Sequence, residues 1–526
     1  MLHSRKHNDV VLVSMPMGPI WTPSIALGLL SSCLKEQGII PTTKYFNLKF
    51  AGLIGVEFYT KLTKHSTVDL VGDWLFSSGL SVEEPTHVAQ YVDDILRGKV
   101  LSPLEAHFTN KPYPEEYITD ILELRKQIPD FLTQCLQEII DIEPKIIGFT
   151  SVFEQHVASL VLAKMIKAEL SDCLIVFGGA NCEGEMGQEL IRQFPFVDVV
   201  VSGEGEIVFP HLVKQFLSEG TLSVYNNMYV QSKPGLVNTA LKEPPRVGLD
   251  KLPFCDYDDF FDQVKEYNVD PAVVTSIPFE TSRGCWWGEK HHCTFCGLNG
   301  LTMSFRSKAA ERALQELTYL VERYPDLSIS VVDNILDYRY FDTFLPALAS
   351  RQLNVNLFYE VKANLKKEQL LLLREAGVRD IQPGIESLSS HVLKLMRKGV
   401  TGIQNVQLLK WCKELGISVG WNILWGFPGE TAEDYSEFAQ AMPLLFHLDP
   451  PAVATHIRLD RFSPYFNEAD KIGFVQLHPY RASQLIYHGL DEQAIYNLSY
   501  YFRIEPDFVK TDGMAFKREM RDLQFR

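Results

Sequence analysis

Three cysteines lie close together in one short stretch of the chain: Cys285, Cys293 and Cys296. Three thiolates are enough to hold a 4Fe-4S cluster while leaving one iron without a protein ligand, so that this iron can bind and reduce a small molecule. A structural zinc normally takes four protein ligands, and no second Cys-x-x-Cys or His-x-x-x-His pair follows downstream. The spacing therefore favours an iron-sulfur cluster. A zinc site completed by His291 or His292 is the alternative.

Composition limits the remaining possibilities. The chain has 526 residues, 46% of them hydrophobic and 22% charged, so it is long enough for several domains with separate cores. Its formal net charge of −16 argues against broad electrostatic binding of nucleic acid or of an anionic membrane. The apolar run at 10–13 is too short for a signal peptide or a membrane span, so we expect a cytoplasmic protein. The other six cysteines are scattered singly, which predicts buried thiols.

Residues 1–220 alternate short apolar runs with helical spacing, which is typical of a parallel doubly wound sheet in an α/β protein. The pattern predicts strands at 10–13, 146–151, 174–179 and 197–201 and helices at 25–38 and 158–170. Residues 49–140 have helical spacing and many aromatic side chains. We interpret them as a mainly helical insertion into this sheet domain.

A linker is expected at 221–275, and a second alternating series follows it at 276–460. Its predicted strands are 279–283, 328–333, 355–361, 380–386, 417–424 and 453–459. This series predicts a partial (β/α)6 barrel, in which the loops that follow the strands form the working face. The cysteines fall in the loop after the first of these strands, and 461–526 remain as a C-terminal extension that could contact the substrate.

A cysteine triplet in this loop resembles the radical S-adenosylmethionine (SAM) enzymes, although their usual spacing is Cys-x-x-x-Cys-x-x-Cys and seven residues separate Cys285 from Cys293 here. The resemblance implies that SAM binds the open iron and is cleaved by one electron to a radical that removes hydrogen from an unactivated carbon. Six further residues match positions at which the family contacts SAM: Phe295, Asp333, Asn334, Glu386, Ser387 and Gly426. Taken singly, each of these would be interpreted as a salt bridge, a helix cap or a turn. Their order after successive strands favours the SAM site.

The N-terminal sheet resembles the cobalamin-binding domain that precedes many radical SAM barrels. The residues that carry this resemblance lie at or shortly after the ends of three of the predicted strands: Thr150, Ser151, Gly178, Gly179, Gly203 and Glu204. The Gly-x-Gly-x-x-Gly fingerprint of NAD-binding domains is absent after the first strand. Because the loop at 14–23 contains no histidine, we expect that bound cobalamin has no cobalt ligand from it. His156, at the start of a predicted helix, is interpreted as a surface or capping residue.

The combination of the two domains resembles the class B methyltransferases. The stretches 285–299, 71–76 and 458–465 are similar to the radical SAM proteins that mature ribosomally synthesised peptides of the bacteriocin type. The resemblance implies a C-methyltransferase that acts on an unactivated carbon of a precursor peptide and takes electrons from a donor such as a flavodoxin or ferredoxin.

Two alternatives remain at this point. One is a radical SAM enzyme of another reaction type, such as rearrangement or oxidation, with or without cobalamin. The other, from a different class, is a non-catalytic, zinc-stabilised peptide-binding protein.

Overall fold

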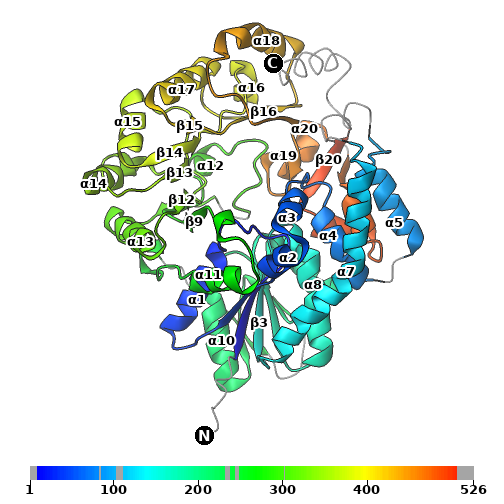
Figure 1. Ribbon diagram of the computed structural model, residues 1–526. Coiled ribbons are helices and arrows are strands. Elements are labelled where there is room, and N and C mark those ends of the chain that lie inside the picture. The colour runs from blue at the N-terminus through cyan, green and yellow to red at the C-terminus, as the bar shows by residue number, and fades with distance from the viewer. Residues whose placement is uncertain are drawn as a thin grey trace. The chain divides into compact units, whose positions relative to one another are not determined.

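The computed structural model describes residues 9–81, 84–101, 111–231, 237–242, 248–300, 303–474 and 476–505. The chain divides into two compact units (Figure 1). The first unit contains Met1–Val274 and Pro479–Tyr500, and the second contains Thr275–His478 and Tyr501–Arg526. This division differs from the expected one, because the stretch at 461–526 is shared between the two units.

The first unit is built around a sheet with the strand order β2-β1-β3-β4-β5-β7. The strands are β1 Val10–Ser14, β2 Thr42–Tyr45, β3 Ile146–Thr150, β4 Leu174–Gly178, β5 Val199–Val201 and β7 Met228–Val230. All are parallel to their neighbours except β7, which runs antiparallel to β5. Every residue of β1 and β3 is buried, which explains why these strands are continuously apolar. The strand order reverses between β1 and β3, and open α/β sheets bind ligands at such a switch point.

Helices cover both faces of this sheet. The helices α1 (Ile25–Glu36) and α10 (Val208–Glu219) lie on one face, and α8 (His156–Glu169) lies on the other, with α7 (Glu115–Ile140) packed against it (Figure 1). The segment expected to be mainly helical contains α7 and the shorter helices α2 Phe46–Ile54, α3 Val56–Thr63, α4 Val71–Phe76 and α5 Pro85–Tyr91. Its aromatic side chains form part of the core, since Trp74 and Tyr91 are fully buried and their rings stack at 4.1 Å.

The segment expected to be a linker belongs to the first unit. Its helix α11 (Asp258–Glu266) packs against β2, where the side chain of Gln263 accepts a hydrogen bond from the Tyr45 backbone and donates one to the Thr43 carbonyl, both at 2.8 Å. The single amide side chain of Gln263 thus completes hydrogen bonds at this edge of the sheet.

Part of the expected C-terminal extension also returns to the first unit. Its helices are α21 (Arg481–Ile486) and α22 (Glu492–Leu498). The Arg481 side chain lies 3.0 Å from the Asp94 carboxylate, and the Asn497 amide donates to Glu189 at 2.8 Å. These contacts join residues separated by more than 300 positions, so no local pattern could have revealed them.

The second unit contains a five-stranded parallel sheet with the order β15-β14-β13-β12-β9 and a separate parallel pair, β16-β17. Its strands are β9 Ser276–Phe279, β12 Ser328–Val331, β13 Leu357–Glu360, β14 Val378–Gln382, β15 Ser418–Val419, β16 Asn422–Trp425 and β17 Val453–His456. Between them run the helices α13 Ala310–Arg323, α14 Phe344–Arg351, α15 Lys367–Glu375, α17 Gly402–Leu415 and α18 Ala432–Leu445 (Figure 1). The expected fifth strand is interrupted at Gly420 and Trp421. The alternating parallel series confirms the predicted α/β fold class.

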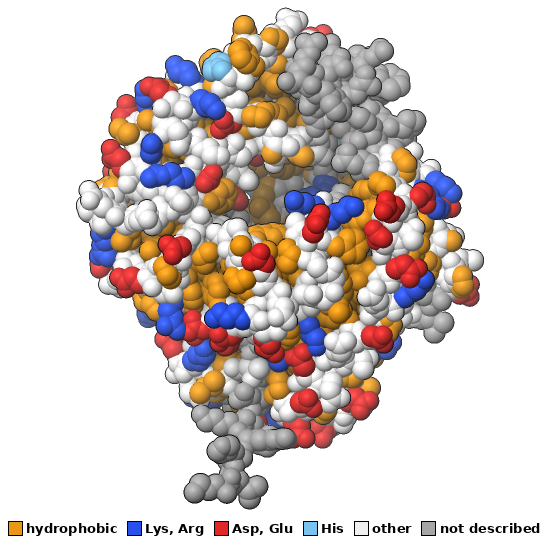
Figure 2. Space-filling model, viewed as in Figure 1, with side chains coloured by type: hydrophobic (Ala, Val, Ile, Leu, Met, Phe, Trp, Pro, Cys, Tyr) orange, Lys and Arg blue, Asp and Glu red, His pale blue; other side chains and the backbone are white. Residues whose placement is uncertain are grey.

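On the face that Figure 2 shows, acidic and basic side chains of the described residues are interspersed and do not gather into one patch of a single charge. None of the helices in the described part of the chain combines the length and the apolar character needed to cross a bilayer.

Candidate functional site

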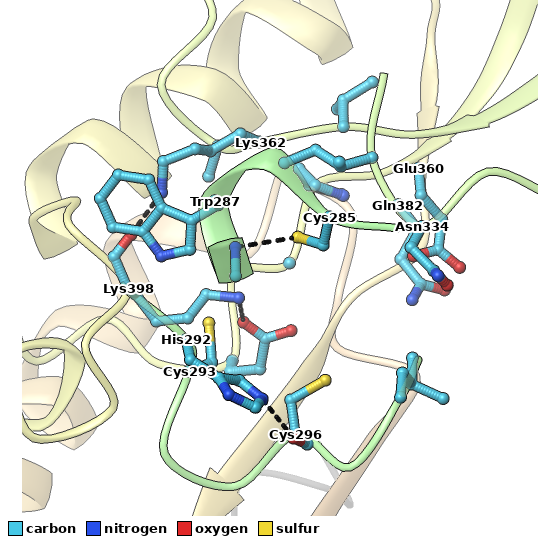
Figure 3. A pocket seen from close by; sticks show the side chains of 18 of the residues that line it. Cys285, Trp287, His292, Cys293, Cys296, Asn334, Glu360, Lys362, Gln382 and Lys398 are labelled. Atoms are coloured by element: carbon cyan, nitrogen blue, oxygen red, sulfur yellow. Dashed lines mark hydrogen bonds and ion pairs between the residues drawn. The ribbon is translucent and has the colours of Figure 1, made fainter. Parts of the chain in front are cut away.

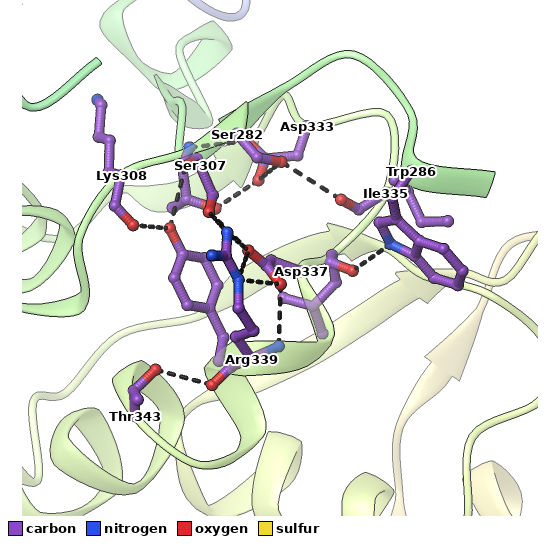
Figure 4. Close-up of polar contacts among 12 residues, drawn as sticks. Ser282, Trp286, Ser307, Lys308, Asp333, Ile335, Asp337, Arg339 and Thr343 are labelled. Atoms are coloured by element: carbon purple, nitrogen blue, oxygen red, sulfur yellow. Dashed lines mark hydrogen bonds and ion pairs between the residues drawn. The ribbon is translucent and has the colours of Figure 1, made fainter. Parts of the chain in front are cut away.

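A short antiparallel ladder closes the base of the loop that carries the three cysteines. Its strands are β10 (Ser282–Arg283) and β11 (Arg306–Ser307). Beneath it, the buried carboxylate of Asp333 accepts hydrogen bonds from the Thr281 backbone at 2.7 Å and from the Ser282 hydroxyl at 2.8 Å (Figure 4). Burial raises the pKa of Asp333 to about 6, although these hydrogen bonds oppose the rise. Asp333 therefore ties the base of the cysteine loop to the end of β12.

A second carboxylate continues this polar network. Asp337 accepts from the Ser307 hydroxyl at 2.6 Å and pairs with Arg339 at 2.7 Å (Figure 4). The indole of Trp286, which directly follows the first cysteine, donates to the Leu336 carbonyl at 3.0 Å. Both ends of the cysteine loop are thus attached to the segment that follows β12.

The three cysteines line one cavity of about 240 Å³ at the carboxyl ends of β12, β13 and β14 (Figure 3). Charged, amide and aromatic side chains from several segments share its wall: Trp287, Phe295, Asn334, Glu360, Lys362, Gln382, Glu386 and Lys398. Residues from positions 285 to 400 therefore converge on one site.

Local backbone features fix the first cysteine. Gly284 has φ +77°, and a Cβ there would lie 2.3 Å from the Ser304 carbonyl oxygen, so only glycine fits. Cys285 then caps the short helix α12 (Trp286–Lys290), and its sulfur accepts a hydrogen bond from the Gly288 backbone at 3.3 Å.

The donor set fits an iron-sulfur cluster better than a single metal ion. Burial raises the pKa of Cys296 to about 12, so its thiolate needs a bound cation at neutral pH. Among the described residues, no three His, Cys, Asp or Glu side chains are grouped so that they could hold one metal ion. A single zinc requires its ligands to converge at about 2.3 Å from one point, whereas the cysteines of a cluster each bind a different iron.

One buried ion pair lies in the wall of the cavity. Lys398 is 2.6 Å from the Glu386 carboxylate, and both side chains are largely buried. Burial disfavours the charge of Lys398, but Glu386, Cys293 and Cys296 together favour it more strongly, and the pKa of the lysine is raised. Gly384 leaves room for this lysine, because a Cβ at that position would be 2.9 Å from the ammonium nitrogen.

Two further charged groups stand next to this pair. Lys362 is 8% exposed, its ammonium lies 3.5 Å from the centre of the Trp287 ring, and it donates to the Lys398 carbonyl. Burial, together with the charge of Lys398, lowers the pKa of Lys362 to about 8. Burial and the nearby Glu386 carboxylate raise the pKa of Glu360 to about 7.

The residues predicted to contact SAM are only partly brought together. Phe295, Asn334 and Glu386 line the cavity. Asn334 donates to the Asn299 side chain at 2.7 Å. The residues that do not line it are Asp333, whose carboxylate bonds to the loop base, together with Ser387 and Gly426. The Gly426 backbone instead donates to the Glu430 carboxylate at 2.8 Å.

Sequence reasoning missed several polar residues of the cavity, among them Glu360, Lys362, Gln382 and Lys398. Glu360 and Lys362 stand at the end of the predicted strand 355–361, and that position was a usable signal, whereas Gln382 lies inside the predicted strand 380–386 and ends the observed β14. Lys398 follows a short helix, α16 (Ser390–Leu395), and nothing in its local sequence marks it.

In the first unit, the residues predicted to hold cobalamin lie at the carboxyl edge of the sheet. Thr150 ends β3 and Ser151 follows it, Gly178 ends β4 and Gly179 follows it, and Gly203 and Glu204 come shortly after β5. Gly179 has φ +102°, and a Cβ there would be 2.6 Å from the Ser151 carbonyl oxygen. The loops after β3 and β4 therefore touch through a glycine. Gly203 and Glu204 are exposed.

The loops after β1 and β3 are also tied together. The Gln155 amide donates to the Ser14 hydroxyl at 3.0 Å and to the Met15 carbonyl at 2.8 Å. His156 is only 5% exposed, and its Nδ1 lies 2.9 Å from the Ser151 hydroxyl. The interpretation of His156 as a surface residue was wrong, because the helix that it starts lies against the sheet. Burial lowers its pKa to about 4.

Comparison with known proteins relates this chain to one superfamily. Residues 279–442 match the Radical SAM superfamily model. An uncharacterized methyltransferase of Pyrococcus horikoshii is 27% identical over 328 residues, which span 57% of this chain and 67% of that protein.

Two solved structures share the fold. The cobalamin-dependent SAM radical enzyme OxsB, solved with aqua-cobalamin and SAM bound, aligns with a TM-score of 0.61 and 16% identity over 97% of this chain. This chain covers 65% of OxsB, less than two thirds of its length. The radical SAM methyltransferase TsrM of Kitasatospora setae, solved with tryptophan and a SAM analogue, aligns with a TM-score of 0.57 and 16% identity over 98% of this chain and 89% of its own.

The superfamily match covers the cysteine loop and most of the strands that surround the cavity. A radical SAM domain implies a 4Fe-4S cluster and SAM, as the three cysteines predicted. The chain is therefore an enzyme with a radical SAM domain at 279–442, and its fold is that of OxsB and TsrM.

Proposed function

We propose that the chain is a cobalamin-dependent radical SAM C-methyltransferase that modifies an unactivated carbon of a ribosomally synthesised precursor peptide. The observation that carries this proposal is the convergence of Cys285, Cys293 and Cys296 on one cavity with strand-end carboxylate and amide groups. The names of the similar proteins, a methyltransferase and a cobalamin-dependent radical enzyme, support the reaction type.

The residues of the cavity have separable roles in this proposal. The three cysteine thiolates would hold the cluster, and Asn334, Glu360 and Gln382 would orient the polar groups of SAM. Phe295 would cover the adenine, and its ring already packs edge-on against Phe427 at 5.8 Å. When bound, the cluster and SAM supply the radical that activates a C–H bond, and cobalamin supplies the methyl group.

The carboxyl edge of the first sheet would hold cobalamin. The switch point between β1 and β3 is the expected ligand crevice, and Gly178, Gly179 and Gly203 present backbone without side chains there. The described loops after β1, β3, β4 and β5 contain no histidine, and His156, the first residue of α8, is buried against Ser151. We therefore propose that no protein histidine ligates cobalt.

The precursor peptide and the electron donor, a flavodoxin or ferredoxin, are the partners in this proposal. The peptide rests on the similarity of the cysteine loop to peptide-maturation enzymes. An acidic chain with a net charge of −16 suits a peptide with basic residues.

The test is co-expression with a candidate precursor peptide and methyl-labelled SAM, followed by mass spectrometry. We expect the mass gain of one labelled methyl group on a peptide carbon. The triple variant Cys285→Ala, Cys293→Ala, Cys296→Ala should contain neither iron nor sulfide and give no product. The matched control is Cys412→Ala, because Cys412 is a buried cysteine of α17 outside the cavity. This variant should keep its iron and sulfide and still give the product.

The alternatives give different results in the same assay. Formation of 5′-deoxyadenosine with an altered peptide that lacks the labelled methyl group would favour another radical reaction. One zinc per chain without iron would contradict the proposal and favour the non-catalytic peptide-binding protein.

A further inference from the structure

The second lysine of the cavity has an unusual environment. Lys362 is almost fully buried, and in the described part of the chain its ammonium forms no ion pair with a carboxylate. Its neighbour Lys398, by contrast, is paired with Glu386 at 2.6 Å. Lys362 therefore brings into the cavity that the cysteines line a positive charge that no carboxylate of the described residues contacts directly.

Two contacts fix the position of this charge. The ammonium lies 3.5 Å from the centre of the Trp287 ring, and it donates a hydrogen bond to the Lys398 carbonyl (Figure 3). A cation over an indole face is stabilised most when it is removed from water, as it is here. The aromatic face thus replaces the carboxylate that a buried lysine would otherwise need.

Trp287 itself is held rigidly. Its indole nitrogen donates to the Arg397 carbonyl at 3.0 Å, and its ring packs on His291 with centres 4.2 Å apart. Gly399 lies so close that a Cβ there would be 2.2 Å from the ring. Trp287 belongs to α12, which lies within the seven residues that separate Cys285 from Cys293. The long spacing of the cysteines therefore provides the ring on which Lys362 rests.

We propose that Lys362, positioned by Trp287, raises the reduction potential of the cluster that Cys285, Cys293 and Cys296 bind. This inference rests on the proposed function. Reduction adds one electron from an external donor to the cluster, which makes its site more negative by one charge. A fixed positive charge beside the cysteines stabilises that reduced state, because the net charge around a cluster helps to set its potential.

The test is a redox titration of the reconstituted protein without SAM, followed by electron paramagnetic resonance. Lys362→Met keeps an unbranched side chain that is one atom shorter, but removes its charge. At the wild-type midpoint we expect its ratio of reduced to oxidised cluster to fall about tenfold, which corresponds to about 59 mV for one electron. Lys362→Arg keeps the charge and should stay near the wild-type midpoint. Trp287→Leu, which releases the lysine, should shift the midpoint in the same direction by less.

Lys367→Met is the matched control, because Lys367 pairs with Glu414 on the exposed side of α15 and its loss should leave the midpoint unchanged. Iron and sulfide content must be equal in all variants that are compared. A wild-type midpoint in Lys362→Met with a full cluster would overturn the inference. If Lys362→Met does not take up iron, an unshifted midpoint in Trp287→Leu would overturn it instead. Failure of the wild-type protein itself to take up iron would contradict the proposed function.

Discussion

At the scale of single residues, the cavity differs from an ordinary protein surface in the way its charges are paired. The ammonium of Lys398 lies 2.6 Å from the Glu386 carboxylate. The carboxylate of Glu360, by contrast, has no hydrogen-bond or ion-pair partner among the described residues. A partly buried carboxylate without a partner favours its proton, and here a second carboxylate nearby adds to that effect. Glu360 is therefore a group of this cavity whose charge changes with pH near neutrality.

The carboxylate of Glu360, unpaired among the described residues, predicts that the stability difference between the wild-type protein and a variant without this carboxylate depends on pH. Burial beside Glu386 raises the pKa of Glu360 from 4.5 to about 7. Between these two values the folded state holds a proton that the unfolded state has released, so stability falls as pH rises. Glu360→Gln removes this cost. Relative to the wild-type protein, the variant should gain about 1–3 kcal/mol between pH 5 and pH 8 in urea unfolding of the apoprotein.

Glu375→Gln, on the exposed surface of α15, serves as the control and should follow the wild-type protein at both pH values. A Glu360→Gln variant whose advantage over the wild-type protein is the same at pH 5 and pH 8 would show that this carboxylate does not titrate in that range.

At the scale of elements, the first unit presents four loops at one edge of its sheet, and three of them are joined by side-chain bonds or close backbone contact. Gln155 ties the loop after β3 to the loop after β1, and Gly179 meets Ser151 from the loop after β4. His156 is oriented by Ser151 and lies at the base of helix α8, buried against the sheet. The carboxyl edge of this sheet is thus formed by backbone groups and short polar side chains.

From this arrangement we predict the coordination of cobalt. The reduced, cob(II)alamin form of the reconstituted protein should show no nitrogen splitting from a protein histidine in its electron paramagnetic resonance spectrum. Comparing protein grown with ordinary and with nitrogen-15 histidine separates a protein ligand from the nitrogen of cobalamin itself. A splitting that changes with the histidine isotope and disappears in His156→Gln would contradict the prediction.

At the scale of the whole molecule, the chain does not divide into units in simple sequence order. Residues 479–500 return to the first unit after the second has been traced. This segment contributes buried apolar side chains, among them Ala482, Ile486 and Ala494. It also forms the bonds of Arg481 to Asp94 and of His488 to Ser81. The first unit is therefore incomplete without it.

This organisation predicts the result of dissecting the chain. Residues 1–274 expressed alone should unfold at a lower urea concentration than the same residues fused through a flexible linker to 479–500. Each large apolar side chain that the returning segment buries is worth about 1.5–3 kcal/mol. A fusion to a scrambled 479–500 sequence is the control and should behave like residues 1–274 alone. Equal midpoints for the two fusions would show that the returning segment does not stabilise the first unit.

The local properties of this protein can be predicted from its amino-acid sequence. Apolar runs such as Val10–Ser14 are strands because they are buried on both sides, and their alternation with helices identified the parallel sheets. The cysteine spacing identified the iron-sulfur chemistry, since ligand number and type depend on residue identity alone. The ends of predicted strands also located Asn334 and Glu386, because parallel strands place their carboxyl ends at one edge.

Which of these residues contact one another depends on how the chain folds in three dimensions. Lys398 enters the cavity because Glu386 pairs with it, and Lys362 is placed by the ring of Trp287, 75 positions earlier in the chain. Asp333 was predicted at the SAM site, yet its carboxylate bonds to Thr281 and Ser282. Such pairings depend on distances in space between segments far apart in sequence. Local periodicity carries no information about these pairings, so the arrangement of charges in the cavity can be read only from the structure.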